Sequence, residues 1–230
     1  MNFVAVIFDC DGVLVDSEVL AIKGERGALE SFGLRYSPAE YVGRFVGLHD
    51  DAFFEALRND FQLAFKTEAP DDFEDRILEG RSQEKHALQV IAGAAAAMGA
   101  AKTRFGAIAV ASSSRAHFLK SKLERTGLYG LAAPHVYSAD LVANGKPSPD
   151  IFLFAAERLG VDPARCLVLE DSENGVRAGC AAGMSVWGFL GGGHCFEGHE
   201  SRLRKAGARQ TVCSFAEFNA QIDGAASGAP

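Results

Sequence analysis

Cysteine is scarce in this chain, and the few thiols follow no binding pattern. Five cysteines are dispersed over 230 residues, and none forms a Cys-x-x-Cys pair. An odd, scattered set argues against a disulfide framework and fits a reduced chain. We therefore expect a cytoplasmic protein.

Basic residues are also in deficit, which argues against a nucleic-acid partner. Lys and Arg number 23 against 30 Asp and Glu, and the formal net charge at pH 7 is −7. The sequence contains no run of Lys or Arg, so it offers no basic stripe to a nucleic-acid backbone. A small anion can still bind, because one local site can oppose the global charge.

Long apolar runs are missing too, which argues against a membrane protein. The N-terminus has no basic segment and its apolar run stops at Asp9, so we expect no signal peptide. The longest uncharged stretch, Ala87–Ala101, is too short to span a bilayer comfortably. The apolar pattern demands no second chain, and we expect a monomer.

What the chain does contain is a series of short, continuous apolar runs. They are Val4–Phe8, Ala107–Ala111, Leu167–Leu169 and Met184–Leu190. Continuous rather than alternating runs are typical of parallel strands that are covered on both faces. Helix-like segments separate the later runs. The sequence therefore predicts an α/β fold with a doubly wound, Rossmann-like parallel sheet.

The interval between the first two runs breaks this pattern. It contains no buried strand and offers several consecutive helices. One of them carries an apolar stripe at helical spacing: Phe53, Phe54, Leu57 and Phe61. We therefore predict a small α-helical cap domain, residues 17–89, inserted after the first strand of a core domain formed by residues 1–16 and 90–230.

Polar side chains follow the predicted strands, at the edge where open α/β sheets bind ligands. Two acids follow the first strand, three hydroxyl groups follow the second, and later segments add an amine and two acids. In chain order these residues are Asp9, Asp11, Ser112, Ser113, Ser114, Lys146, Glu170 and Asp171. Acidic, hydroxyl and ammonium groups are therefore expected along one rim of the sheet.

This combination of groups indicates a metal–phosphate site. Clustered carboxylates repel one another and call for a cation, and hard oxygen ligands suit Mg²⁺ better than zinc. A lysine and hydroxyl groups beside the cation suit a phosphoryl group. One carboxylate can then attack phosphorus while the second protonates the leaving oxygen.

Four segments resemble the motifs of the haloacid-dehalogenase-like superfamily, in that family's order. They are "DCDGVLVDSE" (9–18), which is similar to the first motif of the phosphatase branch, "VASSS" (110–114), "NGKPSPDIF" (144–152) and "LVLEDSENGVRAGCAAGM" (167–184). The resemblance covers nearly the whole chain. The predicted helical insertion is similar to the cap that this family carries after its first motif.

The resemblance implies a role for each motif residue. The catalytic residues would be the nucleophile Asp9, the acid/base Asp11, the phosphate-binding Ser112 and the charge-neutralising Lys146. The Mg²⁺ ligands would be Asp9, Asp11 through its backbone carbonyl, Glu170 and Asp171.

Contacts with the rest of the substrate are predicted in two neighbourhoods. Ser113, Ser114 and Arg115 follow the second motif, where related phosphosugar enzymes hold the non-reacting part of the substrate. An N-cap serine and an exposed first-turn arginine explain Ser114 and Arg115 equally well. The segment "FVGLHDD" (45–51) resembles a cap loop that touches substrate, with Gly47 and His49 as candidates. Ordinary loop residues are the alternative there.

The segment "GGGHCFEGHE" (191–200) gathers His194, Cys195 and His199 within six residues. That spacing suggests a metal site. Three consecutive glycines and the loop context favour a mobile rim instead.

The leading hypothesis is a Mg²⁺-dependent phosphatase that hydrolyses a small phosphorylated metabolite through an aspartyl phosphate. A sugar, sugar-acid or polyol phosphate is the favoured substrate class. A phosphomutase similar to β-phosphoglucomutase shares all four motifs and is the alternative, although "SEVLAIKG" (17–24) lacks the histidine such enzymes carry there. A non-enzymatic phospho-acceptor or binding protein is a distant alternative, because the acids are intact and a helical insertion is present.

Overall fold

The computed structural model describes residues 3–45, 50–83 and 88–224. The chain forms two compact units. We call Met1–Asp16 with Gln89–Pro230 the core unit, and Ser17–Leu88 the helical unit. The predicted cap and core domains have nearly the same limits, and their separate roles stay a prediction.

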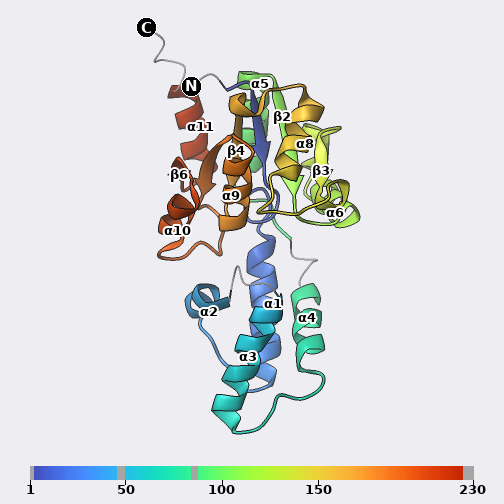
Figure 1. Cartoon of the computed structure of the whole chain (residues 1–230), viewed down its shortest axis with the longest axis vertical. Coiled ribbons are helices and arrows are strands. Elements are labelled where there is room, and N and C mark those ends of the chain that lie inside the picture. Colours follow the sequence, from blue (N-terminus) through green and yellow to red (C-terminus); the bar gives the residue numbers. More distant parts are fainter. Residues whose placement is uncertain (1–2, 46–49, 84–87, 225–230) are drawn as a thin grey trace. The chain divides into compact units, whose positions relative to one another are not determined.

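The core unit is built on a sheet of six parallel strands (Figure 1). Its strands lie in the order β3-β2-β1-β4-β5-β6, so the first strand of the chain is central. The strands are β1 (Ala5–Phe8), β2 (Ala107–Ser112), β3 (Val136–Ser138), β4 (Cys166–Glu170), β5 (Ser185–Phe189) and β6 (Gln210–Val212). The predicted α/β fold is confirmed.

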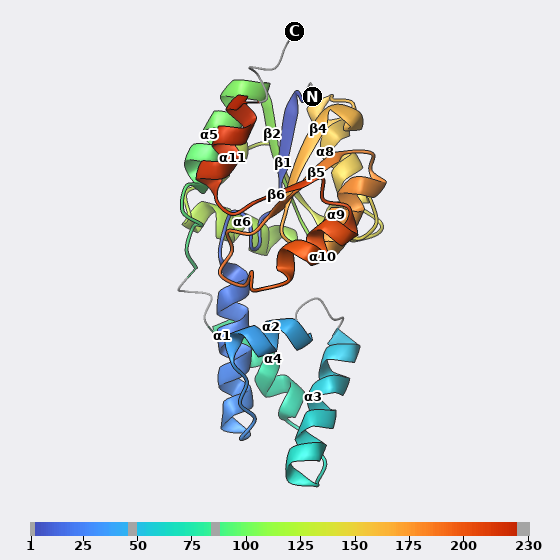
Figure 2. The ribbon, with the colours of Figure 1, turned by 90° about the vertical axis from the view of Figure 1, so that its left-hand side faces the viewer.

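Helices cover both faces of this sheet, as Figure 2 shows. One face is covered by α5 (Ala94–Phe105) and α11 (Phe215–Gly224), and the other by α8 (Asp150–Leu159), α9 (Glu173–Ala181) and α10 (His199–Ala206). The remaining helices of the core unit are α6 (Ala116–Arg125) and α7 (Tyr129–Ala132), together with the short 3₁₀ turns η2 (Ala139–Leu141) and η3 (Pro163–Arg165). No helix in the described part of the chain is long and apolar enough to cross a membrane.

The continuous apolar run of β1 is explained by burial on both sides. Ala5 and Ile7 join the cluster that includes Phe152 of α8, whereas Phe8 packs edge-on against Phe218 of α11 with ring centroids 5.9 Å apart. Side chains alternate across a strand, so a strand covered on both faces needs an apolar residue at every position. Burial on both faces therefore accounts for an apolar residue at each position of β1.

The helical unit has its own apolar core, which is lined with aromatic rings. Its helices are α1 (Ser17–Ser31), α2 (Pro38–Phe45), α3 (Asp50–Phe65) and α4 (Phe73–Gln83). The predicted stripe of α3 is buried in this core. Helices α1 and α4 approach closely at Gly24 and Gly80, where a Cβ on Gly24 would overlap the Gly80 carbonyl oxygen. The buried Glu25 also ties helices together, because it accepts a hydrogen bond from Tyr41 at 2.9 Å and pairs with Arg81.

Candidate active site

The acidic residues converge because three neighbouring parallel strands end at the same edge. Phe8 of β1 is in register with Val110 of β2 on one side and Leu169 of β4 on the other. The next residues, Asp9 and Glu170, therefore emerge beside one another at the carboxyl ends. The backbone N–H of Asp9 donates to Leu169 O at 3.0 Å, which holds Asp9 in line with the sheet.

Lys146 joins the two acids. Its Nζ donates to Asp9 Oδ1 at 2.5 Å, to Glu170 Oε1 at 2.7 Å and to the Ala111 carbonyl oxygen at 3.1 Å. The lysine side chain is only 5% exposed. Burial lowers the pKa of Lys146, but the carboxylates of Asp9 and Glu170 outweigh burial and raise it. The amine is therefore a permanent cation held between two strand ends.

The cluster still carries more negative charge than this lysine neutralises. Asp9, Glu170 and Asp171 are all buried. Burial raises the pKa of Asp9 well above its usual range, and the neighbouring carboxylates raise it further against the opposing effect of Lys146. Ionised Asp9 is therefore costly in this site unless a further positive charge lies nearby.

The donor set fits Mg²⁺. The carboxylate oxygens of Asp9, Glu170 and Asp171 are hard ligands, and Mg²⁺ is commonly bound through a few carboxylates plus water and phosphate oxygens. Ser172 supports this arrangement, because its N–H and Oγ–H both donate to Glu170 Oε2, at 2.8 and 2.9 Å. A divalent cation would offset the charge that Lys146 leaves unbalanced.

Asp11 is held by a second lysine, which sequence reasoning missed. Lys122 of α6 pairs with Asp11 Oδ1, and Ser114 Oγ donates to Asp11 Oδ2 at 2.8 Å. Lys122 Nζ also donates to Ser114 Oγ at 3.0 Å, which closes a three-membered network. Burial lowers the pKa of Lys122, but Asp11 outweighs burial and raises it. The two residues are 111 positions apart, so the local sequence around Lys122 does not indicate this contact.

The hydroxyl residues after β2 are placed differently from one another. Ser112 is buried, and its Oγ accepts from Ser114 N at 3.0 Å and lies 3.4 Å from Asp11 Oδ2. Ser113 and Arg115 are exposed. Ser114 contacts Asp11 rather than capping α6, whose N-cap residue is Arg115. The candidates Gly47 and His49 lie outside the described residues.

The histidines of the segment 191–200 are buried, contrary to the mobile rim expected from its glycines. His194 and His199 are both buried, and both contact Asp171. His194 Nε2 donates to Asp171 Oδ2 at 2.9 Å, and His199 Nε2 donates to the Asp171 carbonyl oxygen at 2.6 Å. Burial lowers the pKa of His194, but the hydrogen bond with Asp171 outweighs burial and raises the pKa to about 11.

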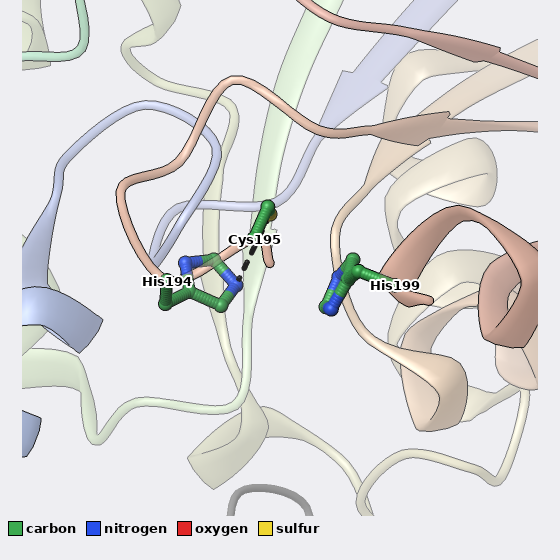
Figure 3. Close-up of side chains that lie close together, drawn as sticks. All are labelled: His194, Cys195 and His199. Carbon is green, nitrogen blue, oxygen red and sulfur yellow. Dashed lines mark hydrogen bonds between the residues drawn. The ribbon is translucent and has the colours of Figure 1, made fainter. Parts of the chain in front are cut away.

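Figure 3 shows how His194, Cys195 and His199 gather, and one ligand atom of each lies within 4.8 Å of the others. Three of the four ring nitrogens already have partners. Besides the two bonds to Asp171, His199 Nδ1 accepts from Arg202 at 3.0 Å. Within the described part of the chain, His194 Nδ1 is buried without a hydrogen-bond partner, and it points away from Cys195. Both imidazoles therefore use Nε2 to bind Asp171, and His194 Nδ1 is the one ring nitrogen of the pair without a partner among the described residues.

One glycine makes room for the acids and gives a test. A Cβ on Gly175, in the first turn of α9, would overlap the carboxylate of Glu170. We expect Gly175→Ala to weaken Mg²⁺ binding and kcat/KM by about 10-fold or more, although alanine favours a helix by roughly 1 kcal/mol. Mg²⁺ titration and steady-state kinetics measure both effects. Gly99→Ala in α5, where a Cβ meets no atom within 4 Å, is the control and should leave both unchanged.

Comparisons with known proteins agree on one family. The family model for haloacid dehalogenase-like hydrolases matches residues 3–183. The phosphorylated carbohydrates phosphatase of Thermotoga maritima is 32% identical over 188 residues, which cover 81% of this chain and 85% of that protein. The 6-phosphogluconate phosphatase of Escherichia coli is 29% identical, with 83% and 84% covered.

A solved structure shows similarity to the same family. A HAD family hydrolase from Deinococcus radiodurans, crystallised with bound phosphate and sodium, is 34% identical and superposes with a TM-score of 0.86. The match covers 98% of this chain and 97% of that one. The likeness therefore extends over both compact units.

Proposed function

The chain belongs to the haloacid dehalogenase-like hydrolase family, and from this membership we propose that it is a Mg²⁺-dependent phosphatase of a small phosphorylated metabolite. The family match and the named phosphatases among its relatives support the assignment as a phosphoric monoester hydrolase. The observation that carries the proposal is the buried group at the strand ends: Asp9 beside Glu170, with Lys146 bonded to both. In this proposal the group supplies a nucleophile, a fixed cation and metal-binding oxygens in one place.

In the proposed reaction Asp9 forms the covalent intermediate. Lys146 donates to Asp9 Oδ1, so we assign the attack on phosphorus to Oδ2. The P–O bond to the leaving group breaks as the aspartyl phosphate forms, and Asp11 gives its proton to the departing oxygen. Asp11 then takes a proton from the water that attacks the aspartyl phosphate, which releases inorganic phosphate and restores Asp9.

Other residues hold these two acids and the phosphoryl oxygens. Ser114 and Lys122 contact the carboxyl group of Asp11 from two sides and fix its position. One of these contacts has to open for Asp11 to carry the proton that it transfers. We assign Ser112 and Lys146 to the transferring phosphoryl group, where an N–H or O–H donor stabilises developing charge. When bound, Mg²⁺ would supply further positive charge to the same oxygens, held by Asp9, Glu170, Asp171 and the Asp11 carbonyl.

We assign the helical unit to substrate recognition, as the cap of this family. Two relatives are named for phosphorylated carbohydrates and for 6-phosphogluconate, and the Deinococcus hydrolase holds phosphate. These names support a sugar, sugar-acid or polyol phosphate as the substrate. We place Ser113, Ser114 and Arg115, with Gly47 and His49, among the substrate contacts. All five cysteines are free thiols, which supports a cytoplasmic location, and a monomer remains the proposed state.

Phosphate release from a panel of phosphorylated sugars, sugar acids and polyols tests the function. We expect release that requires Mg²⁺, stops with EDTA and returns when Mg²⁺ is restored. Glucose 1-phosphate isomerisation, measured with a coupled assay, is the parallel control for a phosphomutase. Isomerisation without net release would replace the phosphatase by the mutase, and the absence of turnover on every ester would overturn the proposal.

A further inference from the structure

Two histidines form hydrogen bonds with two different atoms of Asp171. His194 bonds the side-chain oxygen Oδ2 at 2.9 Å, and His199 bonds the backbone carbonyl at 2.6 Å. Contacts to both the backbone and the carboxylate leave little freedom to the residue between them. Both imidazoles are at most 6% exposed, so water does not compete for these bonds.

The glycines before His194 allow this contact. A Cβ on Gly192 would lie 2.8 Å from both the His194 ring and the Gly12 carbonyl oxygen. A Cβ on Gly12 would overlap Asp171 Oδ2 and lie 2.8 Å from His194 Cε1. The imidazole therefore fits between two backbones that have no side chains, with Nε2 directed at Asp171. The glycine run thus has a packing reason beyond loop flexibility.

The same segment holds the end of the first motif. Gly193 N donates to Asp16 Oδ1 at 3.1 Å, and Asp16 N donates to Gln89 O at 3.0 Å. Asp16 is the last residue of the core unit before the helical unit begins. Two neighbouring residues therefore hold two acids that are far apart in the sequence. Gly193 holds Asp16 through its backbone N–H, and His194 holds Asp171 through its ring nitrogen.

We propose that His194 is a positioning residue that sets the orientation of the Asp171 carboxylate, with His199 fixing the backbone of the same residue, and thereby tunes Mg²⁺ affinity. The proposal rests on the proposed function, in which Asp171 is a metal ligand. Carboxylates that bind metals are oriented by hydrogen bonds from outside the ligand set, and losing such a partner typically costs about 10–100-fold in metal affinity. In this proposal His194 orients the carboxylate of Asp171 and does not contact the substrate.

The test compares two substitutions of His194 whose amide side chains differ in length. Glutamine places its N–H₂ near the position of Nε2, so His194→Gln keeps a donor for Asp171. Asparagine reaches only as far as Nδ1, so His194→Asn has the same chemistry without the bond. We expect His194→Asn to weaken Mg²⁺ binding by about 10–100-fold and His194→Gln to stay within about threefold of wild type.

Mg²⁺ affinity is read by calorimetric titration of metal-free protein and by the rise of Tm with Mg²⁺ concentration. The Mg²⁺ concentration for half-maximal rate should rise in His194→Asn, while kcat at saturating Mg²⁺ changes little. His135→Ala is the matched control, because His135 bonds Tyr137 at 2.7 Å and has no contact with Asp171 in the described structure. A histidine with a purely structural role would lower Tm equally with and without Mg²⁺.

Each result supports or overturns a distinct statement. Equal Mg²⁺ affinity in wild type, His194→Asn and His194→Gln would overturn the positioning role and leave the phosphatase standing. Tight Zn²⁺ binding that is lost in Cys195→Ser, together with unchanged Mg²⁺ affinity, would assign the cluster to a second metal and also overturn it. A wild type that neither binds Mg²⁺ nor hydrolyses phosphate esters would overturn the proposed function itself, and this inference with it.

Discussion

Asp9→Asn is expected to lower phosphate release by on the order of 10⁴-fold or more, because an amide cannot form the aspartyl phosphate. The variant should fold, and without Mg²⁺ it should unfold at an equal or higher temperature than wild type. Burial and neighbouring carboxylates raise the pKa of Asp9, so a neutral group in its place is tolerated better than a charge. The side-chain oxygen of the introduced asparagine can still accept a hydrogen bond from Lys146.

Kinetics and thermal unfolding of the same preparation measure both effects. Asp140→Asn is the matched control, since Asp140 accepts a backbone hydrogen bond from Ala116 and lies outside the strand-end acids. It should keep the activity of wild type. Substantial turnover by purified Asp9→Asn would contradict the covalent mechanism, and a large loss of stability would contradict the electrostatic account of the site.

Lys146→Met is expected to lower both activity and stability. Removing the amine leaves Asp9 and Glu170 buried and unpaired, which typically costs about 3–5 kcal/mol of unfolding free energy. Activity should fall by about 10²–10³-fold, because the proposed role of Lys146 is to supply a fixed positive charge to the phosphoryl oxygens. If Mg²⁺ binds at the same carboxylates as proposed, it should raise the Tm of this variant more than that of wild type.

Denaturant unfolding with and without Mg²⁺, and steady-state kinetics, measure these effects. Lys120→Met is the control, because Lys120 is exposed on α6 and pairs with Glu124 on the surface. Surface pairs contribute about 0–1 kcal/mol, so the control should resemble wild type. If Lys146→Met were as stable as wild type without Mg²⁺, the expectation that Lys146 compensates the buried charges of Asp9 and Glu170 would be wrong.

The sequence alone predicts the sheet and much of the site, because both depend on local patterns. A strand covered on both faces must be apolar throughout, so β1, β2, β4 and β5 are visible as short continuous runs. The edge strands β3 and β6 have only three residues each and give no such signal. Asp9, Ser112 and Glu170 could be placed at one rim because they lie at the ends of visible strands.

The sequence by itself therefore determined the parallel α/β sheet, the family motifs and the acids at the strand ends. Only the tertiary structure decided which charged groups meet. Lys122 and Asp11 are 111 residues apart, Lys146 and Asp9 are 137 apart, and His199 and Asp171 are 28 apart. Such pairs leave no periodic trace in the chain, because helix packing and strand order bring them together. Burial strengthens the contacts of Lys146 and His199, whereas Lys122 and Asp11 stay partly exposed.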